Sequence, residues 1–383
     1  MNDRRRGRSS AVRYEPHDGR EGATVTVVIP CFNYARFLPQ AVDSVLTQEG
    51  VTVDVIVVDD ASTDESVSVA ERLAAADPRV RVVKNERNRG AVETFNRGLA
   101  DARGEFLVRL DADDMLTPGS LRRAAAVMQR LPGVGLVYGH PIHFEGDALP
   151  APRIVARSWT VWSGRDWLQA RCVDGSNVIT SPEVLMRRSV IDVVGGQRPL
   201  AHTHDMEMWL RIAAHSDIAY IVGADQAWHR DHADSLSTKA EHPLLILTEV
   251  RDAFDVLFDG LGADYEGADE LRARAHRAIA LEALAHASRD LDRGRSSGDV
   301  DKLLRFADET DATIGETALR RRLERRTRSD RGLPSFVIAA TGIFPRLRRR
   351  MRQRVRDRRW SATGVYEPLT IRSAAAGDEG YSR

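Results

Sequence analysis

Three carboxylates stand within four residues at the end of a single apolar run. Residues 105–110 have the composition of a buried strand, and Asp111, Asp113 and Asp114 follow them directly. Like charges packed this closely raise one another's pKa, so the cluster costs free energy unless a cation neutralises it. Carboxylate oxygens are ligands that Mg²⁺ and Mn²⁺ prefer. Asp111 and Asp113 face the same way on an extended chain, so the spacing predicts that both approach one divalent ion or its bound diphosphate.

A simpler interpretation of this cluster needs no metal. Asp is favoured in turns and at helix N-caps, so Asp114 could cap the helix expected over residues 118–129. A second acidic pair, Asp59 and Asp60, follows the apolar run 53–58. Ligands bind at the carboxyl ends of the strands of a parallel sheet. Acidic residues at two such ends therefore favour a metal–phosphate site.

The elements that must position these carboxylates alternate along the chain. Apolar, β-branched runs predict strands, and apolar residues at helical spacing predict helices. The predicted strands are 24–29, 53–58, 80–83 and 105–110, and the predicted helices between them are 38–48, 66–76 and 91–102. This alternation is typical of an α/β fold with a mostly parallel sheet flanked by helices.

The pattern beyond residue 115 is mixed. Helices are predicted over 118–129 and 206–215, strands over 134–143, 183–186 and 218–222, and a polar loop over 175–182. Residues 243–324 are rich in Ala, Leu, Arg and Glu, which indicates a helical module. Residues 1–22 and the tail from residue 361 contain little to bury, so we expect both to be disordered.

Composition excludes several classes of protein. Acidic and basic side chains balance at 56 each over 383 residues, so net charge gives no reason to expect a nucleic-acid partner. The two cysteines, Cys31 and Cys172, lack the spacing of a zinc site or a disulfide framework. No apolar run reaches the roughly 18 residues of a membrane span, and the Arg-rich N-terminus lacks a signal-peptide core. We therefore expect a cytoplasmic protein.

Four segments in order resemble those of family 2 glycosyltransferases, which have the GT-A fold. They are 28–33, 57–64, 88–98 with its two Asn-Arg-Gly triplets, and 104–114. Each is weak alone, but together they are specific, and a fainter likeness continues to about residue 240. The resemblance implies a GT-A, Rossmann-like sheet domain over 23–240, divided into donor binding at 23–115 and the acceptor side with the base at 116–240. A helical module at 241–330, an apolar and basic segment at 331–360 and a tail at 361–383 would follow.

The resemblance also implies roles for single residues. Pro30, Phe32 and Asn33 would line the nucleoside pocket, and Asp60 would hydrogen-bond the base or ribose. Asp111 would contact the ribose or the metal, and Asp113 the metal that bridges the diphosphate. The implied donor-binding set is Pro30, Phe32, Asn33, Asp60, Asn88, Gly90, Asn96, Arg109, Asp111, Ala112, Asp113 and Arg230, and the implied metal ligands are Asp111, Asp113 and His232.

One position departs from the family pattern in the donor half. Many relatives have an Arg near the phosphates where this chain has Phe95. Arg89, Arg97 or Arg109 could supply the missing charge.

Inverting transfer needs a base that removes the proton of the acceptor hydroxyl. Asp205 stands before the helix expected over 206–215, and it matches the Asp of a Glu-Asp pair that relatives have there. We assign it the base role, although it could also simply N-cap the helix. Glu207 is a second candidate. His204 replaces the usual Glu.

Two further segments carry hypotheses. Residues 228–237 resemble the family's Arg-x-His-x-x-Ser segment, which makes Arg230 and His232 candidates for contacts with the diphosphate or the metal; a polar surface loop is the alternative. The apolar residues 336–344 precede nine arginines in 346–359. This segment could bind the anionic inner face of the cytoplasmic membrane, where the acceptor could be lipid-linked. It could instead be a helix face exposed to solvent.

The resemblance implies an inverting glycosyltransferase that uses Mn²⁺ or Mg²⁺. It would move a sugar from a UDP-, GDP- or dTDP-sugar to a hydroxyl acceptor in polysaccharide, glycolipid or glycan synthesis. A non-catalytic sugar-nucleotide-binding or scaffold protein is an alternative that the departures at Phe95 and His204 leave open. A nucleotidyltransferase would normally have a Gly-rich basic loop after its first strand, and the Pro-Cys-Phe-Asn of residues 30–33 counts against it.

Overall fold

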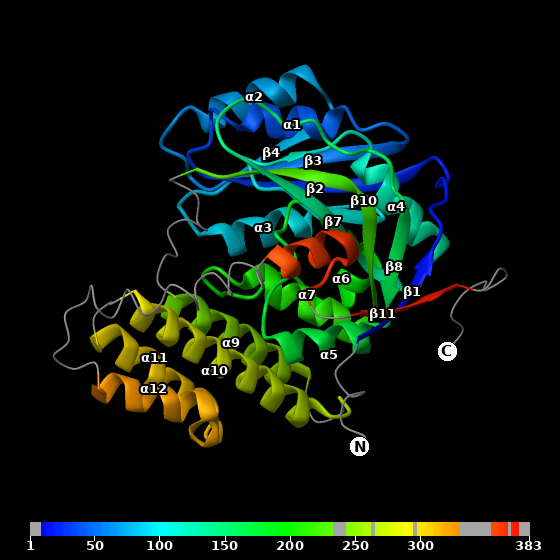
Figure 1. The fold of residues 1–383 in the computed structure, drawn as a ribbon. Coiled ribbons are helices and arrows are strands. Elements are labelled where there is room, and N and C mark those ends of the chain that lie inside the picture. The colour runs from blue at the N-terminus through cyan, green and yellow to red at the C-terminus, as the bar shows by residue number, and fades with distance from the viewer. Residues whose placement is uncertain are drawn as a thin grey trace.

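The computed structural model describes residues 9–232, 243–261, 265–293, 297–329, 354–366 and 369–374. One large sheet runs through the upper part of the molecule, with helices on both of its faces, and a group of helices lies beneath it (Figure 1). The strand order is β11-β1-β8-β10-β7-β9-β5-β2-β3-β4, and β6 pairs with β10. The α/β fold class predicted from the sequence is confirmed.

The N-terminal half of the sheet is wholly parallel. Strand β2 pairs with β3 on one side and with β5 on the other, and β3 pairs with β4. Their side chains are apolar and largely buried, because helices cover both faces of this part of the sheet. The elements are β2 (Ala23–Cys31), α1 (Leu38–Leu46), β3 (Val51–Asp59), α2 (Ser66–Ala76), β4 (Val80–Lys84), α3 (Ala91–Ala100) and β5 (Phe106–Arg109).

The second half of the sheet mixes parallel and antiparallel strands. β10 runs parallel to β7 and antiparallel to β8 and β6, and β9 joins β5 to β7 with antiparallel pairing. The strands are β6 (Met115–Leu116), β7 (Val134–Phe144), β8 (Ser158–Trp162), β9 (Leu185–Arg187) and β10 (Asp217–Arg230), and the helices are α4 (Ser120–Arg130), α5 (Gly164–Asp174), α6 (Arg188–Val194) and α7 (His204–His215).

Strand β10 is longer than the sequence predicted. The apolar pattern ends at residue 222, where Gly223 adopts a φ of +95° and the register with β7 shifts. Beyond this irregularity the strand continues to Arg230. Residues 228–230, expected in a loop, therefore lie at the end of a strand, because a bulge interrupts the side-chain alternation without ending the pairing.

The helical module expected over 243–324 is present. It comprises α9 (Pro243–Leu261), α10 (Ala268–Asp292), α11 (Ser297–Thr310), a 3₁₀ turn η1 (Ile314–Glu316) and α12 (Ala318–Ser329). The long helix α10 packs on α9 and α11 and also on α5 of the sheet domain. Small, buried residues such as Ala275, Ala280 and Ala283 allow this close packing.

Two expectations of disorder were wrong. Residues 9–14 form β1 (Ser9–Tyr14), which pairs with β8 and with β11 (Leu369–Ser373), and residues 354–363 form a helix that reaches into the expected tail. Pairing along the sheet edge satisfies the backbone of these polar strands, so they need little apolar burial. Residues 1–8, 336–344 and 375–383 lie outside the described part of the chain.

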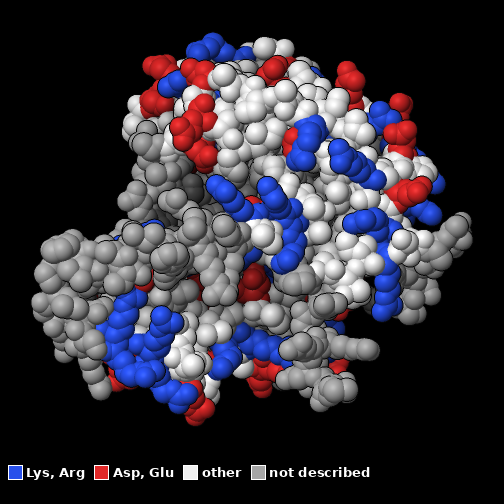
Figure 2. Space-filling model, in the orientation of Figure 1, with Lys and Arg blue, Asp and Glu red and all other residues white. Residues whose placement is uncertain are grey.

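Basic side chains gather over the helix of residues 354–363 and over α12 on the face shown in Figure 2. Arg354 and Arg358 are exposed. Arg356 lies over the ring of Tyr366, and Arg359 donates to the carbonyl oxygen of Tyr366 at 2.9 Å. Part of the basic segment thus contacts the fold itself. No helix within the described residues has the length and apolar character needed to cross a membrane.

Candidate active site

Backbone strain marks one edge of the sheet. Among the described residues, three that are not glycine have positive φ: Asn33 at 59°, Ala61 at 58° and Ser181 at 127°. Asn33 and Ala61 follow the carboxyl ends of β2 and β3, and Ser181 precedes β9, which runs antiparallel to β5. All three therefore lie in loops at the edge where the acidic residues stand. Such strain persists where surrounding contacts hold it, and it clusters at functional sites.

Asn33 joins two of these loops. Its Oδ1 accepts a hydrogen bond from the backbone N–H of Thr63 at 2.8 Å, and its own N–H donates to Ser62 Oγ at 3.0 Å. Its left-handed conformation and its side chain thus set the shape of the loop after β2. Next to it, Phe32 is 40% exposed, which leaves an aromatic ring open to solvent at the strand end. Pro30 is partly buried within β2.

Asp60 holds a third loop in place. One of its carboxylate oxygens accepts from Asn85 Nδ2 at 2.7 Å and from the N–H of Arg89 at 2.8 Å, and the other accepts from the N–H of Gly90 at 2.8 Å. The side chain is only 3% exposed. Asn88 accepts from the same Gly90 N–H at 3.2 Å. Asp60, predicted to contact the nucleoside, therefore shapes the loop around that position.

Polar side chains of helix α3 bond to the protein's own backbone, which does not favour their binding the sugar nucleotide. Asn96 uses both ends of its amide on the backbone of Gln197, at 2.7 and 2.8 Å, and so ties α3 to the chain before α7. Phe95 is buried in the core and Arg97 donates to the carbonyl oxygen of Lys84 at 2.8 Å. The predicted donor contact of Asn96 has no support from these contacts.

Arg109 lies at the centre of the acidic edge. Its guanidinium is buried, 5% exposed, and pairs with Asp111 at 2.7 Å. It also donates to Ser181 Oγ at 3.4 Å, which connects β5 with the loop 175–182. Burial raises the pKa of Asp205 and lowers that of His204; the charge of Arg109 opposes the first change and adds to the second. This buried cation thus lies between Asp111 and the candidate base Asp205.

Asp113 meets His232, 119 residues away in the sequence. The Oδ2 atom of Asp113 lies 2.8 Å from Nε2 of His232. Burial, followed by the charge of Asp111, raises the pKa of Asp113. The ring of His232 packs on Phe37 and Tyr34, with centroids 5.5 and 6.0 Å apart. Two ligands of one octahedral ion at about 2.1 Å lie about 3 Å apart, so the Asp113–His232 spacing suits a divalent metal.

Asp114 fastens strand β10 to the cluster. Its carboxylate accepts from the N–H of Arg230 at 2.9 Å and from His229 Nδ1 at 3.1 Å. Burial raises its pKa to about 7 despite the favourable interaction with His229. The helix α4 begins at Ser120 with Gly119 at its N-cap, so the interpretation of Asp114 as a capping residue was wrong.

Arg230 is buried by the protein's own groups. Its side chain donates to the carbonyl oxygen of Asp113 at 3.2 Å and to Gln40 Oε1 at 2.7 Å. It lies between the rings of Phe37 and Phe144, 4.7 and 4.6 Å from their centroids. These contacts favour a positioning role for Arg230 over the predicted contact with the diphosphate.

A second group of possible metal ligands adjoins this cluster. Ligand atoms of His143, His229 and Asp231 all lie within 4.8 Å of one another. Burial alone would lower the pKa of His229, but the hydrogen bond to Asp114 and the charges of Asp114 and Asp231 raise it to about 9. Sequence reasoning missed His143 and His229, because nothing in their spacing indicates that β7 and β10 bring them together.

Asp205 lies in the first turn of α7. The helix begins at His204, and Thr203 occupies the N-cap position, so the N-cap alternative for Asp205 was wrong. The residue is partly exposed, and its Oδ1 accepts from the N–H of Met206 at 2.6 Å. Burial raises its pKa to about 6, against the opposing effects of that hydrogen bond and of Arg109. Asp205 is thus ionised at neutral pH yet more basic than an ordinary Asp.

The neighbours of Asp205 have other roles. Glu207 is fully buried and pairs with Arg211 at 2.6 Å, which removes it as a candidate base. His204 is 5% exposed, and burial together with Arg109 lowers its pKa to about 4, so its ring is neutral at pH 7. Sequence reasoning also missed Glu183, which accepts from the N–H groups of Thr180 and Ser181 at 2.7 and 3.1 Å and so holds the strained loop.

The sheet topology points to a class of protein. A mostly parallel N-terminal half with acidic residues at its carboxyl edge agrees with the GT-A-type glycosyltransferase fold that the sequence resembles. Residues 26–195 match the model of the family described as "Glycosyl transferase family 2". This match covers less than half of the chain and shows a likeness to that family over these residues.

Relatives support the same assignment over part of their length. The "Succinoglycan biosynthesis protein ExoO" of Rhizobium meliloti is 44% identical over 99 residues, which cover 26% of this chain and 28% of that protein. The "Putative glycosyltransferase EpsE" of Bacillus subtilis is 25% identical over 203 residues, covering 50% of this chain and 66% of that protein. The chain thus matches only part of these relatives.

A solved structure shares the fold. The S. aureus TarS fragment 1–349, crystallised in complex with UDP-GlcNAc, superposes with a TM-score of 0.56. The alignment covers 83% of this chain and 91% of that one at 16% sequence identity. At this identity the likeness concerns the fold.

Proposed function

We propose that the chain is an inverting, metal-dependent glycosyltransferase. It transfers a sugar from a UDP-, GDP- or dTDP-sugar to a hydroxyl acceptor in polysaccharide, glycolipid or glycan synthesis. The observation that carries the proposal is the Asp113–His232 pair at 2.8 Å with Asp205 linked to the same cluster through Arg109. The relative named for succinoglycan biosynthesis and the TarS complex with UDP-GlcNAc support the substrate class.

The donor's nucleoside would lie over the loops after β2, β3 and β4. Phe32 offers an exposed ring for the base, while Asn33 and Asp60 hold the loops in register. Asp113, His232 and Asp111 would hold Mn²⁺ or Mg²⁺, and the bound ion would neutralise the charge that develops on the departing diphosphate. Arg109 keeps Asp111 oriented through their ion pair.

Asp205 would accept the proton of the acceptor hydroxyl. A general base works best when its pKa lies near the working pH, because it is then ionised and still basic enough to accept a proton. The raised pKa of Asp205, about 6, meets both conditions. Attack by the activated hydroxyl on the anomeric carbon, opposite to the leaving diphosphate, inverts the configuration.

Two substitutions test this assignment. Asp113→Ala and Asp205→Asn should each reduce release of nucleoside diphosphate from the donor by about 100-fold or more. Calorimetry with UDP, GDP and dTDP in the presence of Mn²⁺ should show weakened nucleotide binding for Asp113→Ala and unchanged binding for Asp205→Asn. The exposed Asp43, changed to Asn, is the matched control and should behave as the unsubstituted chain. Full activity of either site variant would contradict the proposal.

Peripheral membrane contact is a separate proposal. It rests on the arginines of 346–359, of which only those from residue 354 onward are described. Because residues 354–366 pack against the sheet domain, truncation would disturb the fold. Changing Arg346, Arg348, Arg349 and Arg350 to Ser should instead abolish flotation with anionic liposomes. Equal partitioning of the two chains would show that these residues bind no membrane.

A further inference from the structure

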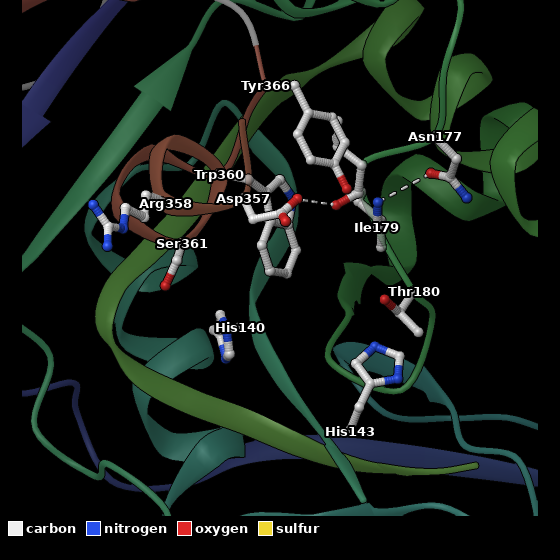
Figure 3. A pocket seen from close by; sticks show the side chains of 11 residues that line it. His140, His143, Asn177, Ile179, Thr180, Asp357, Arg358, Trp360, Ser361 and Tyr366 are labelled. Atoms are coloured by element: carbon white, nitrogen blue, oxygen red, sulfur yellow. Dashed lines mark hydrogen bonds between the residues drawn. The ribbon is translucent and has the colours of Figure 1, made fainter. Parts of the chain in front are cut away.

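A cavity of about 470 Å³ opens between β7, the loop 175–182 and the C-terminal segment 354–366 (Figure 3). His140 and His143 come from β7, Thr180 from the loop, and Trp360 and Tyr366 from the C-terminal segment. None of its lining residues belongs to β2, β3, β4 or the loops that follow them. The cavity is therefore distinct from the surface on which the donor's nucleoside would bind.

The C-terminal wall is fixed by the core of the sheet domain. Tyr138 of β7 donates to the carbonyl oxygen of Gly364 at 2.8 Å, and Tyr220 of β10 donates to that of Ser361 at 3.1 Å. Val365 is fully buried. Gly364 has a φ of +82°, and a Cβ there would come within 2.5 Å of the Tyr220 ring. Residues 354–366, which are distant in sequence from the other lining residues, thus form one wall of the cavity.

The wall presents an oriented aromatic surface. The indole N–H of Trp360 donates to the carbonyl oxygen of Val178 at 2.8 Å, which fixes the ring. Tyr366 stacks beside it at a 22° interplanar angle, and His140 lies 5.2 Å away. Trp360 is only partly buried, and Figure 3 shows it projecting into the space between His140 and Thr180. Its ring is therefore available to a ligand.

Polar groups surround this aromatic surface. Thr180, Asn177, Asp357 and Arg358 supply hydroxyl, amide and charged groups at its rim. Specific small-ligand sites combine apolar walls with a few fixed polar groups. A sugar ring fits this combination, because its C–H face stacks on an aromatic ring while its hydroxyls hydrogen-bond at the edges.

The cavity adjoins the candidate active site through two contacts. The ring of His143 lies 4.8 Å from that of His229, which hydrogen-bonds Asp114. Thr180 precedes Ser181, whose hydroxyl accepts from Arg109. A ligand in the cavity would therefore be a neighbour of the reacting groups.

From this geometry we propose that the cavity binds a sugar ring of a carbohydrate acceptor, with Trp360 as its stacking platform. The proposal rests on the glycosyltransferase function, and it adds that the acceptor is itself a glycan. It also assigns a specificity role to the C-terminal segment, which lies beyond the residues that match the family model.

Saturation-transfer NMR tests the proposal with neutral tetrasaccharides of glucose in α-1,4, β-1,4 and β-1,3 linkage and of N-acetylglucosamine in β-1,4 linkage. At least one should receive saturation from the full chain. Trp360→Ala should reduce that signal about fivefold or more, and Trp360→Phe should retain most of it, since a ring remains. Thr180→Val, which keeps the side-chain size, should weaken it independently of the fold of the C-terminal segment. Asp43→Asn should leave it unchanged.

The outcome is separable from that of the glycosyltransferase assignment. Calorimetric binding of UDP, GDP or dTDP with Mn²⁺ reports the donor site, and Trp360→Ala should keep that affinity within about twofold because Trp360 lies outside the donor loops. No saturation transfer to any tetrasaccharide, or equal signals in Trp360→Ala and the unsubstituted chain, would overturn the proposed cavity function even where nucleotide binding is normal.

Discussion

At the scale of residues, the site depends on carboxylates in different environments. Asp111 is paired with Arg109, Asp113 with His232, and Asp205 stands partly exposed with a pKa raised to about 6. The chain thereby separates groups that would hold a cation from a group that would take a proton. A different role for each carboxylate follows from its neighbours rather than from its type.

The pKa of Asp205 predicts a pH dependence. Burial raises it from 3.8 to about 6, so the ionised, proton-accepting form is lost as the pH falls below 6. We expect kcat/KM to fall about tenfold per pH unit below that value. Burial also raises the pKa of Asp114 and of Glu183 to about 7, so a substitution must show which group causes the fall in kcat/KM. The fall in kcat/KM below pH 6 should be absent from the residual activity of Asp205→Asn. If the fall persists in this variant, another group causes it.

Only some of the residues and contacts of the candidate site could be predicted from the sequence. The acidic cluster after β5 and the candidate base were predicted because their local sequence is distinctive. The resemblance implied that Asp113 and His232 are both metal ligands, but the contact between them was not predicted, and the roles of Glu183 and His143 were missed. These depend on strands that meet only in the folded chain, and no local pattern encodes such meetings.

At the scale of elements, the parallel half of the sheet was predicted well because its strands are buried on both faces. Continuous apolar runs between helical patterns have few other interpretations. The second half was harder. β10 continues beyond its bulge at Gly223, and the edge strands β1 and β11 are held by backbone pairing with little apolar burial. Neither the bulge nor the backbone pairing of these edge strands produces a periodic pattern of apolar residues in the sequence.

Close packing of α3 on β2 and β3 gives a stability prediction. A Cβ on Gly98 would lie 2.4 Å from Val28 Cγ1 and 2.8 Å from Val58 Cγ2. Gly98→Ala should therefore lower the free energy of unfolding by about 1–3 kcal/mol, since overpacking forces both elements to shift. Gly315, which has open space around it, is the matched control. Urea unfolding of the two Ala variants measures the difference, and equal midpoints would show that α3 adapts freely.

At the scale of the whole molecule, the C-terminal segment 354–366, which follows the helical module in the sequence, packs against the sheet domain. The hydroxyl of Tyr138 and the carbonyl of Gly364 are buried and bond each other at 2.8 Å. Tyr138→Phe would leave that carbonyl without its donor, at a cost of about 1–3 kcal/mol. Amide exchange in residues 354–366 should then accelerate while that of β2 and β3 stays unchanged. Unchanged exchange in the segment would mean that other contacts hold it.

The central claim is that Asp113 and His232 hold the catalytic ion while Asp205 faces the donor sugar. Crystals grown with Mn²⁺ and the nucleoside diphosphate that calorimetry selects, measured at the manganese edge, test it most directly. The account predicts an anomalous peak about 2.1–2.3 Å from Asp113 and His232, with the diphosphate between it and Arg109. A peak at His143, His229 and Asp231 instead, or no peak beside Asp113, would contradict it.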